Sequence, residues 1–151
     1  MLSKVKLFFD NVLNGSESVV DTGDNTQLAA ALLLVEVMNA DHNIDEREKK
    51  AVQAGLKNIF DLSDEEVREI FEIAEDHAKD VVSLQKYTSI LNSDLKPEEK
   101  LNLLEQIWRV VLSDDNVDKY EEHLVRQIAE LLYIRHSDYI FARERAKSDA
   151  G

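Results

Sequence analysis

An acidic segment that occurs twice constrains the fold of this chain more than any other feature. The sequence NADHNIDEREKKAV at residues 39–52 returns as LSDDNVDKYEEHLV at residues 112–125. Five residues are identical in the two copies, and each lies 73 positions after its counterpart, as Asp114 does after Asp41. An apolar segment precedes and follows the acids each time. This constant offset predicts an internal duplication of a helix–acidic corner–helix unit.

The scarcity of turn residues indicates which kind of secondary structure the repeat contains. The 151 residues include four glycines and one proline, so loops must be short and few. Apolar residues recur at helical spacing along most of the chain, and a chain of this length can bury one substantial core. We therefore predict an all-α fold, a single bundle of about seven to eight helices.

Several local signals place individual helices. Residues 28–38, LAAALLLVEVM, are apolar nearly all round and predict a helix at the centre of the core. Ser63 followed by Glu66 is a capping-box pattern for a helix start, and Pro97 is suited to the first position of another helix. Ser137 is expected to cap a last short helix.

The same signals suggest the domain organisation. We expect an N-terminal helix and linker over residues 1–26, because the polar stretch NGSESVVDTGDNTQ interrupts the helical pattern. The bundle would then occupy residues 27–147, with internal repeats around 28–60 and 101–133. Residues 148–151 are expected to form a disordered tail.

The charge balance limits the classes of partner. There are 18 basic and 31 acidic residues, a formal net charge of −13, which repels nucleic acid and attracts cations and basic protein surfaces. Without cysteine the chain has no disulfide, as is compatible with a reducing cytoplasm. The apolar run at 28–38 is too short to span a bilayer. We expect a cytoplasmic protein with a protein partner, no nucleic acid and no integral membrane segment.

The repeated acids form two candidate cation sites. In each corner three oxygen-bearing side chains alternate along a short turn, and a glutamate follows one helical turn later. Oxygen ligands of this kind favour calcium, magnesium or manganese over zinc or copper. The candidate ligands are Asp41, Asn43, Asp45 and Glu48 in the first corner, and Asp114, Asn116, Asp118 and Glu121 in the second.

The corners are not standard EF-hand loops. An EF-hand carries a glycine at position six and a bidentate glutamate at position twelve. Here Glu46 and Lys119 occupy position six, and Val52 and Val125 occupy position twelve. A cation site at these corners would be of another kind.

Helix capping offers an alternative explanation for the same acids. An aspartate at the N-cap accepts a hydrogen bond from the helix start, and a glutamate three residues later returns one, which together stabilise by about 1 kcal/mol. Asp45 with Glu48, and Asp118 with Glu121, fit this pattern. Capping leaves the leading Asp and Asn of each corner unexplained, so both interpretations stay open.

No residue pattern indicates catalysis. His77, His123 and His136 lack metal-ligand spacing, and no nucleophile–base arrangement stands out. We expect no catalytic residues, and Trp108 is expected in the core. The basic run RERAK at 143–147 is expected to be a solvated helix end that could contact an acidic partner.

The stretch from QLAAALLLVEVMNADHNIDEREKKAV to VDKYEEHLVRQIAELLYIRHSDYIFARERA resembles the TerB-like tellurite-resistance family. The resemblance covers nearly the whole chain after residue 26, and its second quoted part is the more specific. It implies an all-helical duplicated bundle, an association with tellurite resistance or stress response, proposed cation binding at the acidic corners and no established enzymatic activity.

The family's corner acids match Asp41, Asp45 and Glu48, and Asp114, Asp118 and Glu121. One departure is that His42 and Asp115 stand where the family usually has glycine. Two hypotheses follow: a non-enzymatic module that binds divalent cations at the corners, or a metal-free helical scaffold for protein–protein interaction. A hydrolytic function, which would need both corners to converge, ranks last.

Overall fold

The computed structural model describes residues 22–40, 46–60, 62–77, 84–113 and 119–150. Within these ranges the chain forms seven α-helices and no strand, which confirms the all-α prediction. The helices are α2 (Thr22–Ala40), α3 (Glu46–Ile59), α4 (Asp64–His77), α5 (Leu84–Asp94), α6 (Pro97–Leu112), α7 (Lys119–Leu131) and α8 (His136–Ala150). The helix expected near the N-terminus lies outside the described residues.

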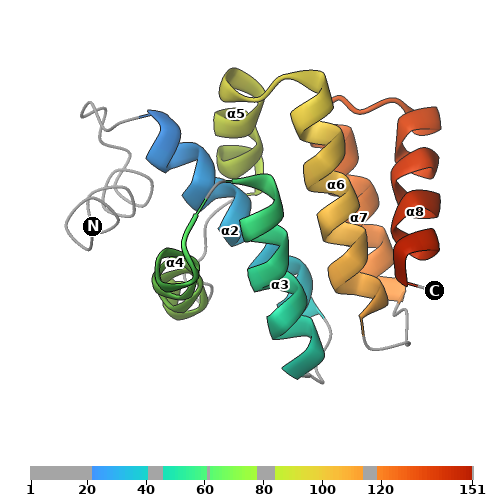
Figure 1. Cartoon of the computed structure of the whole chain (residues 1–151). Helices are drawn as coiled ribbons and strands as arrows, with labels where there is room; N and C mark the ends of the chain where they lie inside the picture. The colour runs from blue at the N-terminus through green and yellow to red at the C-terminus, as the bar shows by residue number, and fades with distance from the viewer. Residues whose placement is uncertain (1–21, 41–45, 61, 78–83, 114–118, 151) are drawn as a thin grey trace.

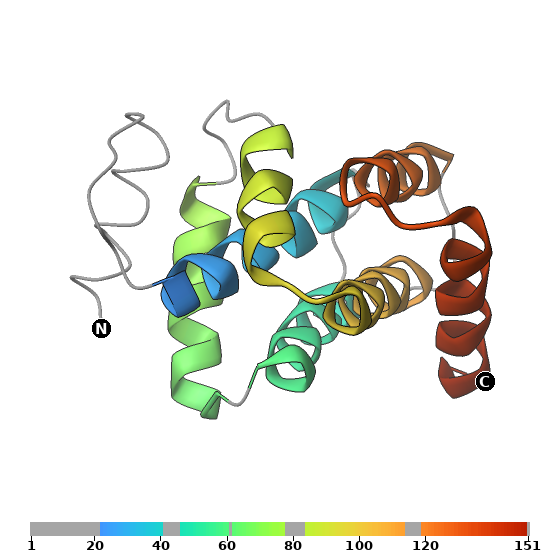
Figure 2. The ribbon, with the colours of Figure 1, turned by 90° about the horizontal axis from the view of Figure 1, so that it is seen from above.

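Helix α2 runs through the middle of the bundle (Figures 1 and 2). It packs against α3, α4, α5, α6 and α7, so that its apolar side chains are covered on every side. From Leu28 to Met38 every residue except Glu36 is buried. This placement confirms the central position predicted for the apolar run.

The remaining helices are arranged around α2. Helices α3 and α6 lie side by side, while α4 and α8 lie at opposite ends of the molecule (Figures 1 and 2). Helix α8 packs mainly on α6 through Tyr139, Ala142 and Ala146, which are 2%, 1% and 0% exposed. Their spacing of three and four residues forms one helical stripe.

Two of the predicted helix starts are confirmed. The backbone N–H of Glu66 donates to Ser63 Oγ, and the N–H of Ser63 donates to Glu66 Oε1, both at 3.1 Å. Pro97 is the first residue of α6, where its missing N–H costs no helical hydrogen bond.

Two helix boundaries differ from those that the local sequence signals suggest. Helix α2 begins at Thr22, inside the expected linker, and the hydroxyl of Thr26 donates to Asp94 Oδ2 at 2.6 Å. Helix α8 begins at His136 rather than after Ser137, and it continues to Ala150, where a disordered tail was expected from residue 148. Helix α2 packs on α5, and helix α8 packs on α6. Such tertiary contacts stabilise helical structure where local sequence signals alone do not predict it. The domain boundaries themselves stay predictions.

The bend after α7 has an unusual backbone conformation. Ile134 N–H donates to the carbonyl of Ala129, and Tyr133 N–H donates to that of Glu130, each at 3.0 Å. This is the Schellman pattern, which requires a left-handed residue and usually places glycine there. Tyr133 takes that role with φ 58°, and its exposed side chain avoids a clash with the core.

Glu36 is the one half-buried acid in the apolar part of α2, and burial raises its pKa above 4.5. At neutral pH the folded state must therefore hold a carboxylate that the unfolded chain solvates better. The contribution of Glu36 to stability is most favourable below pH 4.5 and is lost as pH rises through the folded-state pKa.

We expect Glu36→Gln to raise the thermal midpoint at pH 7, with a gain that shrinks as pH falls toward 4.5 and then disappears. Melting curves between pH 4 and pH 8 would measure this, with the exposed Glu65→Gln on α4 as the matched control. A gain that does not depend on pH would contradict the assignment to Glu36 ionisation.

Candidate functional site

The two acidic corners connect described helices. The first joins α2 to α3 and the second joins α6 to α7. Six of the eight candidate cation ligands lie outside the described residues: Asp41, Asn43, Asp45, Asp114, Asn116 and Asp118. Cation binding at the corners, their convergence and the duplication therefore stay predictions.

The remaining two candidate ligands, Glu48 and Glu121, are inside the protein. Each is 0% exposed. Glu48 is the third residue of α3 and Glu121 is the third residue of α7, so each lies within the first helical turn after its corner. Equivalent positions of the sequence repeat thus carry equally buried carboxylates.

Two other helices provide an internal comparison for these glutamates. Glu66 and Glu99 are the third residues of α4 and α6. Glu66 accepts from the Ser63 backbone N–H at 3.1 Å, and Glu99 accepts from the Lys96 backbone N–H at 2.8 Å. Glu66 is half-buried and Glu99 is exposed. In this bundle, a glutamate can complete a capping box without being removed from solvent.

Burial distinguishes Glu48 and Glu121 from these two capping glutamates. An ionised carboxylate in the interior is costly unless positive charge or hydrogen-bond donors compensate it. Near the start of α3, the Lys49 ammonium lies 3.8 Å from carboxylate oxygens of both Glu46 and Glu75.

The described residues alone do not form a metal site. Among them no group of three or more histidine, aspartate or glutamate side chains is placed to hold an ion. This is the result expected when only Glu48 and Glu121 of the candidate ligands are described.

The aromatic and histidine side chains take structural or surface positions. Trp108 is 2% exposed, which confirms its predicted place in the core. His123 and His136 are exposed, and His136 stacks on Tyr139 with ring centroids 5.9 Å apart. His77 lies at the end of α4. These positions give no cluster of histidines within the described helices.

The basic run of α8 is more than the solvated helix end that we predicted. Arg145 Nε lies 2.9 Å from Glu105 Oε1 on α6, and Glu105 Oε2 also pairs with Arg109 at 2.9 Å. The guanidinium of Arg143 lies 5.7 Å from the centroid of the Trp108 ring. Two arginines of the run thus fasten α8 to α6.

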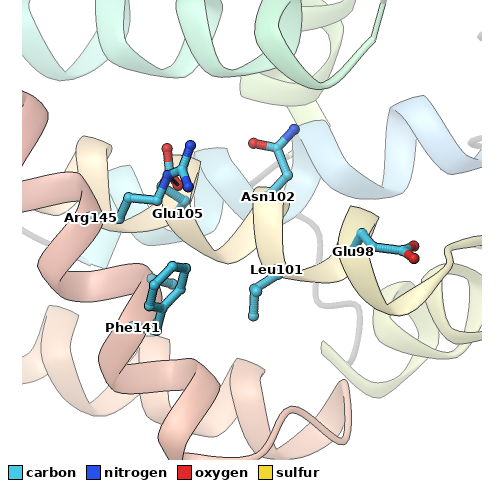
Figure 3. A pocket seen from close by; sticks show the side chains of 7 residues that line it. Glu98, Leu101, Asn102, Glu105, Phe141 and Arg145 are labelled. Atoms are coloured by element: carbon cyan, nitrogen blue, oxygen red, sulfur yellow. Dashed lines mark ion pairs between the residues drawn. The ribbon is translucent and has the colours of Figure 1, made fainter.

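A groove between α6 and α8 was not predicted from the sequence. It has a volume of about 240 Å³, and Figure 3 shows Phe141 from α8 and Leu101 from α6 beside it, with the Arg145–Glu105 pair at one end. Phe141 is 53% exposed although Tyr139 and Ala142, on either side of it in the sequence, belong to the core. Helical periodicity could have predicted the exposure of Phe141. Tyr139, Ala142 and Ala146 form the buried stripe of α8, and Phe141 lies outside that stripe.

Together, the central apolar helix, the helix pairs joined by the acidic segments and the buried glutamates define an all-helical bundle. The family model described as tellurite resistance protein TerB matches residues 27–144. The chain belongs to the TerB family. Comparison with curated proteins and with solved structures finds no match. No described helix is both long enough and apolar enough to cross a membrane.

Proposed function

We propose that this TerB-family protein is a non-enzymatic, cytoplasmic module that binds divalent cations at its two acidic corners. Its ligands would be Asp41, Asn43, Asp45 and Glu48 in one corner, and Asp114, Asn116, Asp118 and Glu121 in the other. The observation that carries the proposal is the complete burial of Glu48 and Glu121 at equivalent positions of the repeat.

The chemistry of the corners supports a hard cation. Every candidate ligand presents oxygen, and three carboxylates with one amide in each corner give a strongly negative environment. A divalent ion would offset both the mutual repulsion of the acids and the desolvation of the buried glutamate. Calcium, magnesium and manganese are the candidates, because these ions prefer oxygen ligands.

A cation at each corner would act on the bundle through the helices that meet there. It would link the end of α2 to the start of α3, and the end of α6 to the start of α7. Binding would stiffen these two helix pairs and change the surface offered to a protein partner. The TerB family suggests a tellurite-resistance or stress-response setting for that partner.

The test is the stability of the full chain with and without each ion. At fixed ionic strength, an ion at a hundred times its dissociation constant should add about 2.7 kcal/mol for each occupied site relative to EDTA. We expect Glu48→Gln and Glu121→Gln each to reduce this gain, because each removes one candidate carboxylate ligand. Thermal and urea unfolding would measure the reduction.

Glu66→Gln and Glu99→Gln are matched controls, because they change the same residue type at the same helix position without a corner before it. They should lose only capping energy and keep the full response to the ion. An ion effect reduced equally by all four substitutions would point to general charge screening and contradict the proposal.

The metal-free scaffold is the second candidate, and the groove between α6 and α8 favours it. Phe141 is the kind of exposed aromatic that anchors protein interfaces, and the neighbouring Ile140 is 36% exposed. The scaffold predicts the same unfolding midpoint in EDTA as in each cation. That result would support helix capping as the role of the corner acids, and this groove would be the candidate interaction surface.

A further inference from the structure

We infer that the groove between α3 and α4 is a binding site for a small, multiply charged oxyanion of the phosphate type. The groove has a volume of about 280 Å³ and shares no lining residue with the groove beside α8. Its lining residues are Lys50, Gln53, Ala54 and Lys57 of α3, and Asp64, Val67 and Arg68 of α4.

Helical spacing explains why these side chains share one groove. On α3 the lining residues follow each other by three, one and three positions, which keeps them on one face; those of α4 follow by three and one. Val67 is 4% exposed and belongs to the apolar core beneath the groove. Ala54 has a small side chain, so the space above that core stays open.

The groove is locally positive in a strongly negative protein. Lys50, Lys57 and Arg68 bring three positive charges, and Asp64 is the single carboxylate among the lining residues. The chain as a whole carries a net charge of −13. The lining of this groove therefore has two more positive than negative charges, whereas the protein as a whole is strongly negative.

One ion pair organises the groove. Lys57 Nζ lies 2.6 Å from Asp64 Oδ1, which joins the end of α3 to the start of α4. The hydrogen bond and the charge of Lys57 lower the pKa of Asp64, and the charge of Arg68 lowers it further. Arg68 and Lys57 therefore both act electrostatically on the Asp64 carboxylate, whereas Asp64 forms its ion pair with Lys57.

An oxyanion would complete this arrangement. Ammonium and guanidinium groups both donate to phosphate oxygens, and the Gln53 amide adds a neutral donor from the same face of α3. The volume exceeds that of a single phosphate and suits a compact molecule that carries one or two phosphate groups. Because the lining cations are exposed and the molecule is acidic overall, binding should weaken steeply with salt.

Inorganic phosphate and pyrophosphate are the probes for the test. They would be titrated into the full chain at low ionic strength, with chloride at matched ionic strength as the reference, while amide resonances are followed by NMR. We expect shifts concentrated in α3 and α4, and tighter binding of pyrophosphate. Lys50→Gln and Arg68→Gln should each weaken binding by about three- to tenfold.

We expect Asp64→Asn to have the opposite effect on affinity. It removes the one carboxylate among the residues that line the groove and should tighten binding about threefold. Lys147→Gln is the matched control, since it removes an exposed lysine charge from α8 at the opposite end of the molecule. Binding that Lys147→Gln weakens as much as Arg68→Gln does, or that Asp64→Asn weakens, would overturn the site. So would shifts no larger than those caused by chloride.

Discussion

Replacing Trp108 by alanine is expected to lower the free energy of unfolding by about 3–5 kcal/mol, because it deletes a large buried aromatic side chain. Trp108 is 2% exposed and meets Tyr139 edge-on, with ring centroids 5.6 Å apart and planes at 66°. Arg143 also lies over its ring. The substitution therefore removes core packing and two contacts that hold α8 on α6 at once.

Urea unfolding followed by far-UV circular dichroism would measure this loss, since Trp108 is the only tryptophan and its fluorescence disappears with it. Trp108→Phe keeps an aromatic ring against Tyr139 and should retain more stability than Trp108→Ala. The exposed Phe141→Ala on α8 is a control for general damage to that helix. A loss below about 1 kcal/mol for Trp108→Ala would contradict the packing described for α6 and α8.

The central position of α2 leads to the second large effect. Leu32 and Leu34 lie two residues apart and so point to nearly opposite sides of the helix. Their exposed fractions are nevertheless 1% and 0%. We expect Leu32→Ala and Leu34→Ala each to cost about 2–5 kcal/mol, as typical buried leucines do.

An amphipathic helix should behave differently at the same spacing. On α7, Ile128 is 0% exposed and Glu130 is exposed. Ile128→Ala should be strongly destabilising, whereas Glu130→Ala should stay within about 0.5 kcal/mol of the parent. Chemical unfolding of all four variants tests the contrast. If one of the two α2 leucines proved as tolerant as Glu130, helix α2 would have an open face in solution.

The elements with strong local signals were predictable from the sequence. Ser63 with Glu66, and Pro97, mark helix starts through interactions within a few residues, so no tertiary information was needed. The apolar run at 28–38 predicted its own burial because only a central position covers a helix on all sides. Family membership followed from longer stretches of the same sequence.

Features that arise from packing between distant segments were not predictable in this way. The early start of α2 and the length of α8 depend on neighbouring helices, which local patterns do not specify. At the candidate site, the sequence singled out Glu48 and Glu121 by the acids that precede them, but it did not predict that they are buried while Glu66 and Glu99 are not. Burial depends on the packing of the whole bundle.

The position of α2 also decides what the smallest folding unit of this protein is. Sequence repeats often suggest that each copy could stand alone. Here α2 packs on α3 from its own helix pair and on α6 and α7 from the other, so neither pair can cover its apolar surface without the other. The two helix pairs are therefore expected to unfold together in one cooperative transition.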